Sequence, residues 1–139
     1  MRSLLLVCTA AITVVILDAL WLGALMSRFY NSALGTLARR AADGSLDPSW
    51  GAAALVYVAL GVGVVGFVLP LVAGGSLGDA FLRGALFGIV VYGVYDLTNY
   101  ATLRDWPVRL VAIDIAWGGV VGGVTTAVVS LVARRLSVS

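Results

Sequence analysis

The sequence lacks histidine, lysine and glutamate, and it contains a single cysteine, Cys8. Without histidine, the chain has neither the commonest metal ligand nor the commonest general base of proteins. Cys8 has no second cysteine for a disulfide, and because it lies in an apolar run we predict a buried, unreactive thiol. No nucleophile motif, phosphate-binding glycine loop or haem-ligand pattern is present. Arginine and aspartate are therefore the only charged side chains.

Charged residues are scarce: they make up 12% of the 139 residues, whereas hydrophobic residues make up 61%. A soluble domain is usually about half apolar and about a quarter charged. A soluble chain of this length has too little interior for so much apolar surface, but a bilayer accommodates it. The mean hydropathy of +1.05 agrees. The net charge of +2 comes from scattered arginines without a basic stripe, so we expect membrane lipid as a partner and no nucleic acid.

Four stretches are long enough to cross a bilayer, which takes about 20 mostly apolar residues. They are residues 3–26, 50–73, 80–99 and 108–133. Their continuous apolar character indicates helices, because the strands of a membrane barrel alternate over about ten residues. The first stretch exceeds the roughly 7–15 apolar residues of a signal peptide, so we expect it to remain as a helix. The predicted fold is all-α: a four-transmembrane-helix bundle that forms one integral membrane domain over residues 1–139.

Residues 27–44 have a different pattern, in which apolar and polar side chains lie on opposite sides of a helix. The apolar side carries Tyr30, Ala33, Leu34, Leu37 and Ala41. This pattern predicts an amphipathic helix that lies in the membrane interface between spans one and two and stops near Gly44. The alternative is a short helix outside the membrane that packs on the bundle.

Two helix starts carry capping signals. Asp47-Pro48 predicts an N-cap followed by proline at the first helical position of span two. Ser76 and Asp79 have the spacing of a capping box ahead of span three.

Four spans place both termini on the same side of the membrane. The arginines divide four against five, with Arg2, Arg83, Arg134 and Arg135 on the terminal side and Arg28, Arg39, Arg40, Arg104 and Arg109 on the other. The positive-inside rule therefore does not separate the two orientations. The Arg134-Arg135 pair near the end of the chain favours cytoplasmic termini.

Small residues recur four apart in spans three and four, which lets two helix backbones approach closely. They are Gly84, Gly88, Gly118, Gly119, Gly122 and Gly123. These glycines are expected either to join helices within the chain or to join it to a second copy or to a larger membrane complex.

Three aspartates lie inside the predicted spans: Asp18, Asp96 and Asp114. A charged side chain at the bilayer centre costs about 2.5–3.5 kcal/mol on insertion scales, so three of them need a shared reason. At 1.5 Å per residue, they lie about 12, 5 and 10 Å below helix ends that all belong to the face away from the termini. We therefore expect the three carboxyls to meet in one half of the membrane.

The residues around these acids repeat. Asp18-x-x-Trp21-x-Gly23 in span one matches Asp114-x-x-Trp117-x-Gly119 in span four. A spacing of three puts each aspartate and its tryptophan on one helix face. In span three, Tyr92, Asp96 and Asn99 form one stripe, and Arg104 follows in the next loop, where it is positioned to pair with a carboxylate.

Two hypotheses account for these residues. In the first, the acids form the floor of a pocket walled by aromatic rings; in the second, they only bond across helices and fix the bundle. Interhelical hydrogen bonds contribute on average only about 0.6 kcal/mol each, which is less than the cost of placing an acid in the membrane. This difference favours the pocket. The candidate ligand-binding or proton-accepting residues are Asp18, Trp21, Tyr92, Asp96, Asn99, Arg104, Asp114 and Trp117. We predict no metal and no cofactor, and we interpret Trp50 and Trp106 as interfacial anchors.

The stretch from Tyr95 to Pro107 (YDLTNYATLRDWP), followed by Asp114-x-x-Trp117-Gly118, resembles a family of small bacterial membrane proteins, domain of unknown function 2177. Asp18-x-x-Trp21-Leu22-Gly23 is similar to the first-helix motif of that family. The resemblance covers essentially the whole chain. It implies a four-helix protein of the bacterial cytoplasmic (inner) membrane, and it implies no particular activity.

The functional hypothesis is a pocket that binds a small molecule or a lipid headgroup, with lipid modification as an added activity. Asp96 and Asn99 would position the ligand, Asp18 or Asp114 would accept a proton, and Arg104 would hold an anionic group. One alternative is a proton- or ion-coupled transporter that acts as an oligomer. The other is a non-catalytic accessory subunit of a larger membrane complex.

Overall fold

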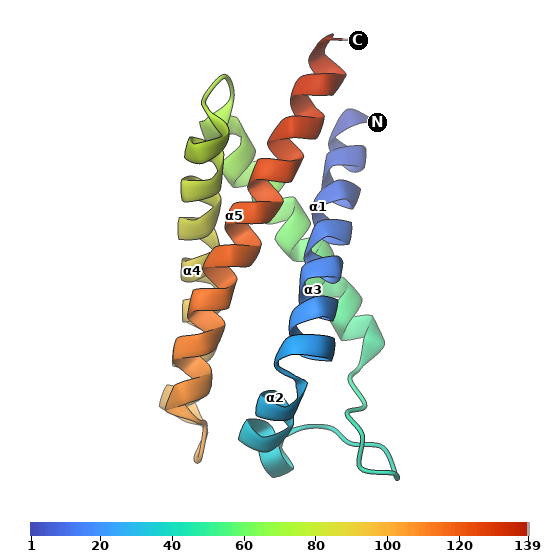
Figure 1. The fold of residues 1–139 in the computed structure, drawn as a ribbon, viewed down its shortest axis with the longest axis vertical. Coiled ribbons are helices and arrows are strands. Elements are labelled where there is room, and N and C mark those ends of the chain that lie inside the picture. The colour runs from blue at the N-terminus through green and yellow to red at the C-terminus, as the bar shows by residue number, and fades with distance from the viewer. Residues whose placement is uncertain (139) are drawn as a thin grey trace.

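The computed structural model describes residues 1–138, which fold as four long helices and one short one. The four segments Arg2–Leu25, Trp50–Val72, Leu77–Thr102 and Val108–Ser137 are long and apolar enough to cross a membrane. Both termini lie at the same end of the molecule (Figure 1). The predicted four-helix membrane bundle is confirmed.

Two of the spans change helix type along their length. Helix α1 (Arg2–Asp18) continues as a π-helix over Ala19–Leu25. Helix α3 (Trp50–Gly63) continues as a π-helix over Val64–Val68 and ends as a 3₁₀-helix over Leu69–Val72. Such wide turns recur near functional sites in proteins, and the first of them begins directly after Asp18.

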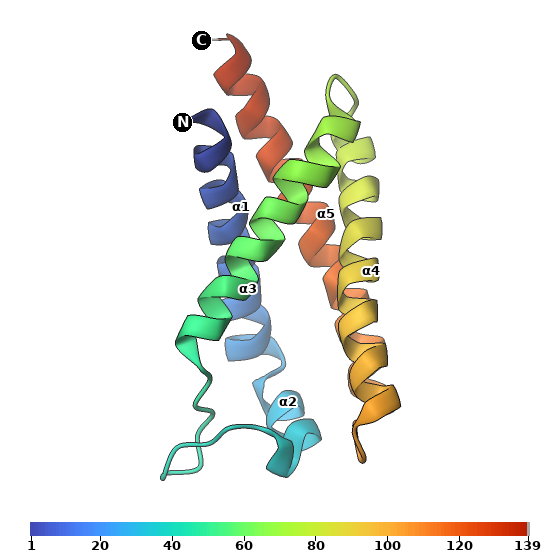
Figure 2. The same cartoon turned by 180° about the vertical axis from the view of Figure 1, so that it is seen from behind.

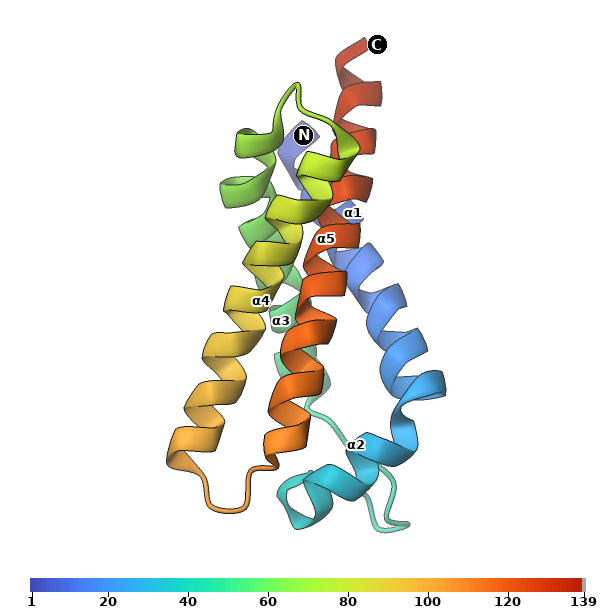
Figure 3. The ribbon, with the colours of Figure 1, turned by 60° about the vertical axis from the view of Figure 1, so that its left-hand side comes forward.

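Helices α4 (Leu77–Thr102) and α5 (Val108–Val138) form a closely packed antiparallel pair, side by side in Figures 1 and 3. A side-chain carbon added at Gly88 would collide with the carbonyl of Gly118, and one added at Gly84 would collide with the carbonyl of Gly122. Gly119 and Gly123 also face side chains of α4. The predicted small-residue contacts therefore operate within the chain, and association with another copy or a complex through the same glycines stays a prediction.

The apolar core lies in the half of the bundle that contains the termini. Leu6, Ala10, Val64 and Val129 bring α1, the end of span two and α5 together there. Helix α3 crosses the bundle diagonally and lies in front of the other helices in Figure 2. Since lipid tails are as apolar as these side chains, close van der Waals packing rather than transfer from water stabilises this core.

One stripe of α1 faces the bundle, with a buried residue at every fourth position: Leu6, Ala10, Val14 and Asp18. Cys8 lies on the opposite side of the helix and is exposed, so the prediction of a buried thiol is wrong. The hydrophobic run around Cys8 indicated the membrane, but did not indicate which side of the helix packs. The same stripe carries Asp18 into the interior.

The predicted amphipathic helix over residues 27–44 is shorter than expected. Helix α2 is Ser27–Leu34, followed by a 3₁₀ turn over Gly35–Leu37. The guanidinium of Arg40 folds back and donates to the carbonyl oxygens of Asn31, Gly35 and Gly44 at 3.0–3.2 Å. These bonds stabilise a loop in place of further helical turns, and Gly44 (φ +83°) lies in that loop rather than at a helix end.

The two capping predictions have different outcomes. Ser76 caps α4, because its Oγ accepts a hydrogen bond of 3.0 Å from the backbone nitrogen of Asp79. The prediction for Asp47 is wrong, because α3 begins at Trp50 after Ser49. The backbone nitrogen of Asp47 instead donates to the carbonyl of Arg39 at 3.0 Å, which ties this residue into the preceding loop.

Candidate functional site

A cavity of about 260 Å³ lies in the half of the bundle away from the termini. Spans one, three and four, α2 and two connecting segments contribute to it, whereas no described residue of span two does. Its polar and aromatic lining consists of Asp18, Tyr30, Tyr92, Tyr95, Trp106, Asp114 and Trp117, and Leu22, Leu34, Leu46 and Leu110 complete the wall. A cavity therefore lies in the half of the bundle that contains Asp18 and Asp114, and its use as a binding pocket stays a prediction.

The two Asp-x-x-Trp repeats bond to each other crosswise. Trp117 donates from Nε1 to Oδ1 of Asp18 at 2.9 Å. Trp21 donates from Nε1 to the hydroxyl of Tyr30 at 3.0 Å, and that hydroxyl donates to Oδ1 of Asp114. Each tryptophan is thus linked to the aspartate of the other repeat. Trp117 bonds to Asp18 directly, whereas Trp21 is linked to Asp114 through Tyr30.

The rings of Trp21 and Trp117 stack on each other, with centroids 4.3 Å apart and planes 5° from parallel. Offset or stacked aromatic pairs add about 0.5–1.5 kcal/mol to the contact of their surfaces. The stack fixes the orientation of both indole nitrogens, and hence the positions of the two carboxyls.

Tyr30 reaches the site because α2 packs back beneath the end of span one. Its side chain is 7% exposed. Burial, and then the hydrogen bond to Asp114, raises the pKa of Tyr30 above its ordinary value. The phenol therefore keeps its proton and acts as a permanent donor to the Asp114 carboxyl.

Asp96 is fully buried beside this cavity, and neither of its carboxyl oxygens has a hydrogen-bond partner among the described residues. It follows Tyr95 directly and lies four residues after Tyr92, and both tyrosines line the cavity. The indole nitrogen of Trp106 is also buried without a hydrogen bond of normal geometry among the described residues, although it lies close enough to Asp96 to interact with that carboxyl. An unsatisfied buried polar group costs about 1–3 kcal/mol, more when charged, so Asp96 is not explained by stability alone.

The structure brings together most of the predicted site residues, although not in equal roles. Asp18, Tyr92, Asp114 and Trp117 line the cavity, and Trp21 stacks behind Trp117. Asn99 is half-buried on α4. Arg104 is exposed and makes no hydrogen bond or ion pair within residues 1–138, where the one ion pair joins Arg83 to Asp79 at the opposite end.

Three aromatic lining residues were not predicted as part of the site: Tyr30, Tyr95 and Trp106. Tyr30 was assigned to the apolar side of an interfacial helix, and the sequence carries no signal for the direction in which that helix packs. Trp106 was interpreted as an interfacial anchor, but its side chain lines the cavity. It packs edge-on against Tyr95, with ring centroids 6.1 Å apart. The short loop between α4 and α5 is the signal that places Trp106 near both helix ends.

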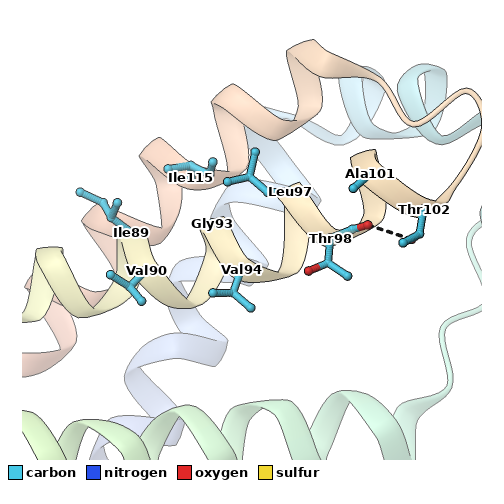
Figure 4. A pocket seen from close by; sticks show the side chains of 9 residues that line it. All are labelled: Ile89, Val90, Gly93, Val94, Leu97, Thr98, Ala101, Thr102 and Ile115. Atoms are coloured by element: carbon cyan, nitrogen blue, oxygen red, sulfur yellow. Dashed lines mark hydrogen bonds between the residues drawn. The ribbon is translucent and has the colours of Figure 1, made fainter.

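A larger groove of about 630 Å³ runs along the outer side of α4 (Figure 4). Its walls are Ile89, Val90, Val94, Leu97 and neighbouring small residues, with Ile115 from α5. The hydroxyl of Thr102 donates a hydrogen bond of 2.8 Å to the carbonyl oxygen of Thr98. This groove offers no acid and no aromatic ring, so the smaller polar cavity is the candidate site.

A family profile described as "Predicted membrane protein (DUF2177)" matches residues 3–131 of the chain. The match includes the Asp18 and Asp114 repeats and all of α4. No curated protein and no solved structure matches significantly.

Proposed function

The chain belongs to the DUF2177 family of predicted membrane proteins, and we propose that it binds the headgroup of a small amphiphile or lipid in its polar cavity. That it is a multi-pass membrane protein follows from its family and its four spans. The observation that carries the proposal is the pair of carboxyls, Asp18 and Asp114, held by indole and phenol donors in the wall of one cavity.

The lining favours a positively charged headgroup. Within the part of the chain that the structure describes, no arginine lines the cavity, and each of the two carboxyls has an oxygen that accepts no hydrogen bond. Tyr92, Tyr95 and Trp106 add ring faces, to which amines and quaternary ammonium groups are attracted. We therefore assign the ligand to cationic amines, either a protonated amine or a quaternary ammonium.

The size of the cavity limits what enters it. Pockets for drug-sized ligands usually measure about 300–1,000 Å³, whereas this one measures about 260 Å³. A headgroup fits inside, and any attached chain must leave the cavity. Modification of a bound lipid at this site would use Asp18 or Asp114 as the proton acceptor.

The interior beyond Tyr92 supports ligand binding over transport. On the terminal side of Tyr92 lies a cavity of only about 10 Å³, enclosed mainly by Val14, Val64, Phe87 and Val121. A space of this size holds at most about one water molecule. The polar cavity therefore ends against an apolar layer rather than continuing toward the terminal face.

Choline and its neutral isostere, in which carbon replaces the quaternary nitrogen, test this proposal. Purified protein in neutral detergent is titrated with each, and tryptophan fluorescence reports binding, because Trp106 and Trp117 line the cavity. We expect choline to bind more tightly than the isostere. Asp18→Asn and Asp114→Asn should each weaken choline binding about tenfold, as expected for the loss of one charge-assisted contact.

Asp79→Asn is the matched control, because Asp79 pairs with Arg83 at the other end of the protein and should leave choline binding unchanged. Equal binding of both compounds would refute the cationic assignment. Undiminished choline binding by both Asp18→Asn and Asp114→Asn would refute the site itself.

A further inference from the structure

We propose that a second cavity, at the end that contains the termini, binds the phosphate group of an anionic lipid. It measures about 280 Å³ and lies between the start of α1, the end of span two and the last turns of α5. It shares no lining residue with the cavity that contains Asp18, so the two proposals are independent.

Two arginines, Arg2 and Arg134, line this cavity, and no acidic residue among residues 1–138 does. Arg2 donates from Nη2 to the carbonyl of Ala133 at 3.0 Å and to Oγ of Ser137 at 2.6 Å. Arg134 donates from Nη2 to the carbonyl of Gly75 at 2.5 Å. These bonds fix both guanidinium groups against the backbone without neutralising their charge.

Both guanidinium groups keep donors for a ligand. A guanidinium carries five N–H donors in a planar fork, and within residues 1–138 only Nη2 of each is engaged. The remaining Nε and Nη1 donors point in different directions, and each can donate a single charge-assisted hydrogen bond to a phosphate oxygen. Arg83, on the same face, differs because Asp79 holds it in an ion pair of 3.0 Å.

Ser130 adds an independent observation. Its side chain is 4% exposed, it lines the cavity, and its hydroxyl has no hydrogen-bond partner. A serine or threonine inside a helix commonly donates to the carbonyl four residues earlier. Ser137 does so here at 2.8 Å, as does Thr13, whereas Ser130 and the buried Thr125 and Thr126 do not. Of these three unpartnered hydroxyls, that of Ser130 belongs to the lining of this cavity. A ligand oxygen in the cavity would supply the partner that this buried hydroxyl lacks.

The remaining wall indicates a lipid rather than free phosphate. Leu69, Pro70, Val72 and Ala73 supply an apolar part of the wall. Helix ends of a membrane bundle lie at the level of the lipid headgroups, where arginines attract anionic lipids. A lipid can contact the arginines with its phosphate group and the apolar residues with its chains, whereas inorganic phosphate can contact only the arginines.

The test is native mass spectrometry of the full chain in neutral detergent, titrated with dioleoyl phosphatidylglycerol. Dioleoylglycerol, which lacks the phosphate, and inorganic phosphate, which lacks the chains, separate the two contributions. We expect saturable binding of phosphatidylglycerol only. Arg2→Gln and Arg134→Gln should each weaken it about tenfold. Arg135→Gln removes a neighbouring charge outside the cavity and should have little effect.

Ser130→Ala leaves the hydrogen bonds of Arg2 and Arg134 intact. Any loss of lipid binding by this variant therefore cannot be attributed to displaced ends of α1 or α5. Weaker phosphatidylglycerol binding by this variant, with an unchanged unfolding temperature, supports the site. An equal loss in Arg135→Gln and Arg134→Gln would show diffuse attraction and overturn the proposal. Equally tight binding of inorganic phosphate would overturn the assignment to a lipid.

Discussion

Trp117 donates a 2.9 Å hydrogen bond to Asp18, which precedes it by 99 residues. The same indole stacks on Trp21, one turn beyond Asp18 in span one. Spans one and four are therefore joined by an aromatic contact and a polar contact that share one side chain. The arrangement holds a carboxyl at a defined place in the cavity wall.

Replacement of Trp117 by phenylalanine separates these two contacts. Trp117→Phe retains an aromatic ring against Trp21 but leaves Asp18, which is 9% exposed, without its donor. We expect the free energy of unfolding to fall by about 1–3 kcal/mol, the cost of an unsatisfied buried polar group. Reversible unfolding in mixed micelles measures this change. Trp50→Phe, at a residue 75% exposed, is the control, and an equal loss in both variants would contradict a stabilising role for the bond.

The hydroxyl of Tyr30 should affect the behaviour of the protein in alkali. Because the folded protein raises the pKa of Tyr30 above its ordinary value of 10.0, the unfolded chain releases this proton first. The resulting stabilisation is complete below about pH 10 and is lost as the pH rises further. Tyr30→Phe should make stability fall less steeply above pH 10. Ultraviolet titration of Tyr30→Phe should show that the missing tyrosine ionisation is one that occurs above pH 10 in the unsubstituted protein. If the missing ionisation instead occurs near pH 10, the expectation is wrong.

Close packing of α4 on α5 should make Gly88 intolerant of a side chain. Gly88→Ala places a methyl group against the carbonyl of Gly118, and backbone cannot move aside as a flexible side chain would. We expect a loss of about 1–3 kcal/mol or more in the free energy of unfolding. Gly66→Ala is a matched control in span two, where nothing lies within 4 Å of the added carbon. Equal stability of the two variants would show that α4 and α5 separate easily.

The buried carboxyl of Asp96 should lower the free energy of unfolding of the protein. This carboxyl is fully buried without a hydrogen-bond partner among the described residues, so Asp96→Leu removes an unsatisfied group and keeps the branched shape of the side chain, with methyl groups larger than the oxygens they replace. We expect the free energy of unfolding to rise by about 1–3 kcal/mol. Asp79→Leu, which removes the exposed Arg83 pair, should change it by less than about 1 kcal/mol. A lower stability of Asp96→Leu would contradict this expectation, and an equal loss in Asp96→Asn, which adds no volume, would show that the carboxyl has a partner.

The number and limits of the spans were predictable because hydrocarbon thickness fixes helix length and four uninterrupted apolar runs satisfy it. The approach of Asp18 to Asp114 was also predictable, because depth follows from counting residues along a helix. The crosswise pairing was not predictable. It depends on how α1 crosses α5, and their sequences specify the face that packs but not the angle between the helices.

The region after span one shows where local pattern fails. Apolar periodicity predicted a helix through residues 27–44, but the guanidinium of Arg40 competes for the carbonyls at its end. Arg104 shows the same limitation, since its place in the loop suggested a partner for the acids and its side chain instead faces outward. Long side chains reach in many directions, and position in the sequence does not choose among them.

The crosswise bonds also impose an order on biosynthesis. Asp18 emerges from the ribosome with the first span, whereas its donor Trp117 lies in the fourth. Until that helix enters the membrane, the carboxyl of Asp18 has no indole to bond, and span one carries an acid that disfavours its insertion. The first helix can pack on span two earlier, but its Asp18 carboxyl gains an indole donor only after the last helix arrives.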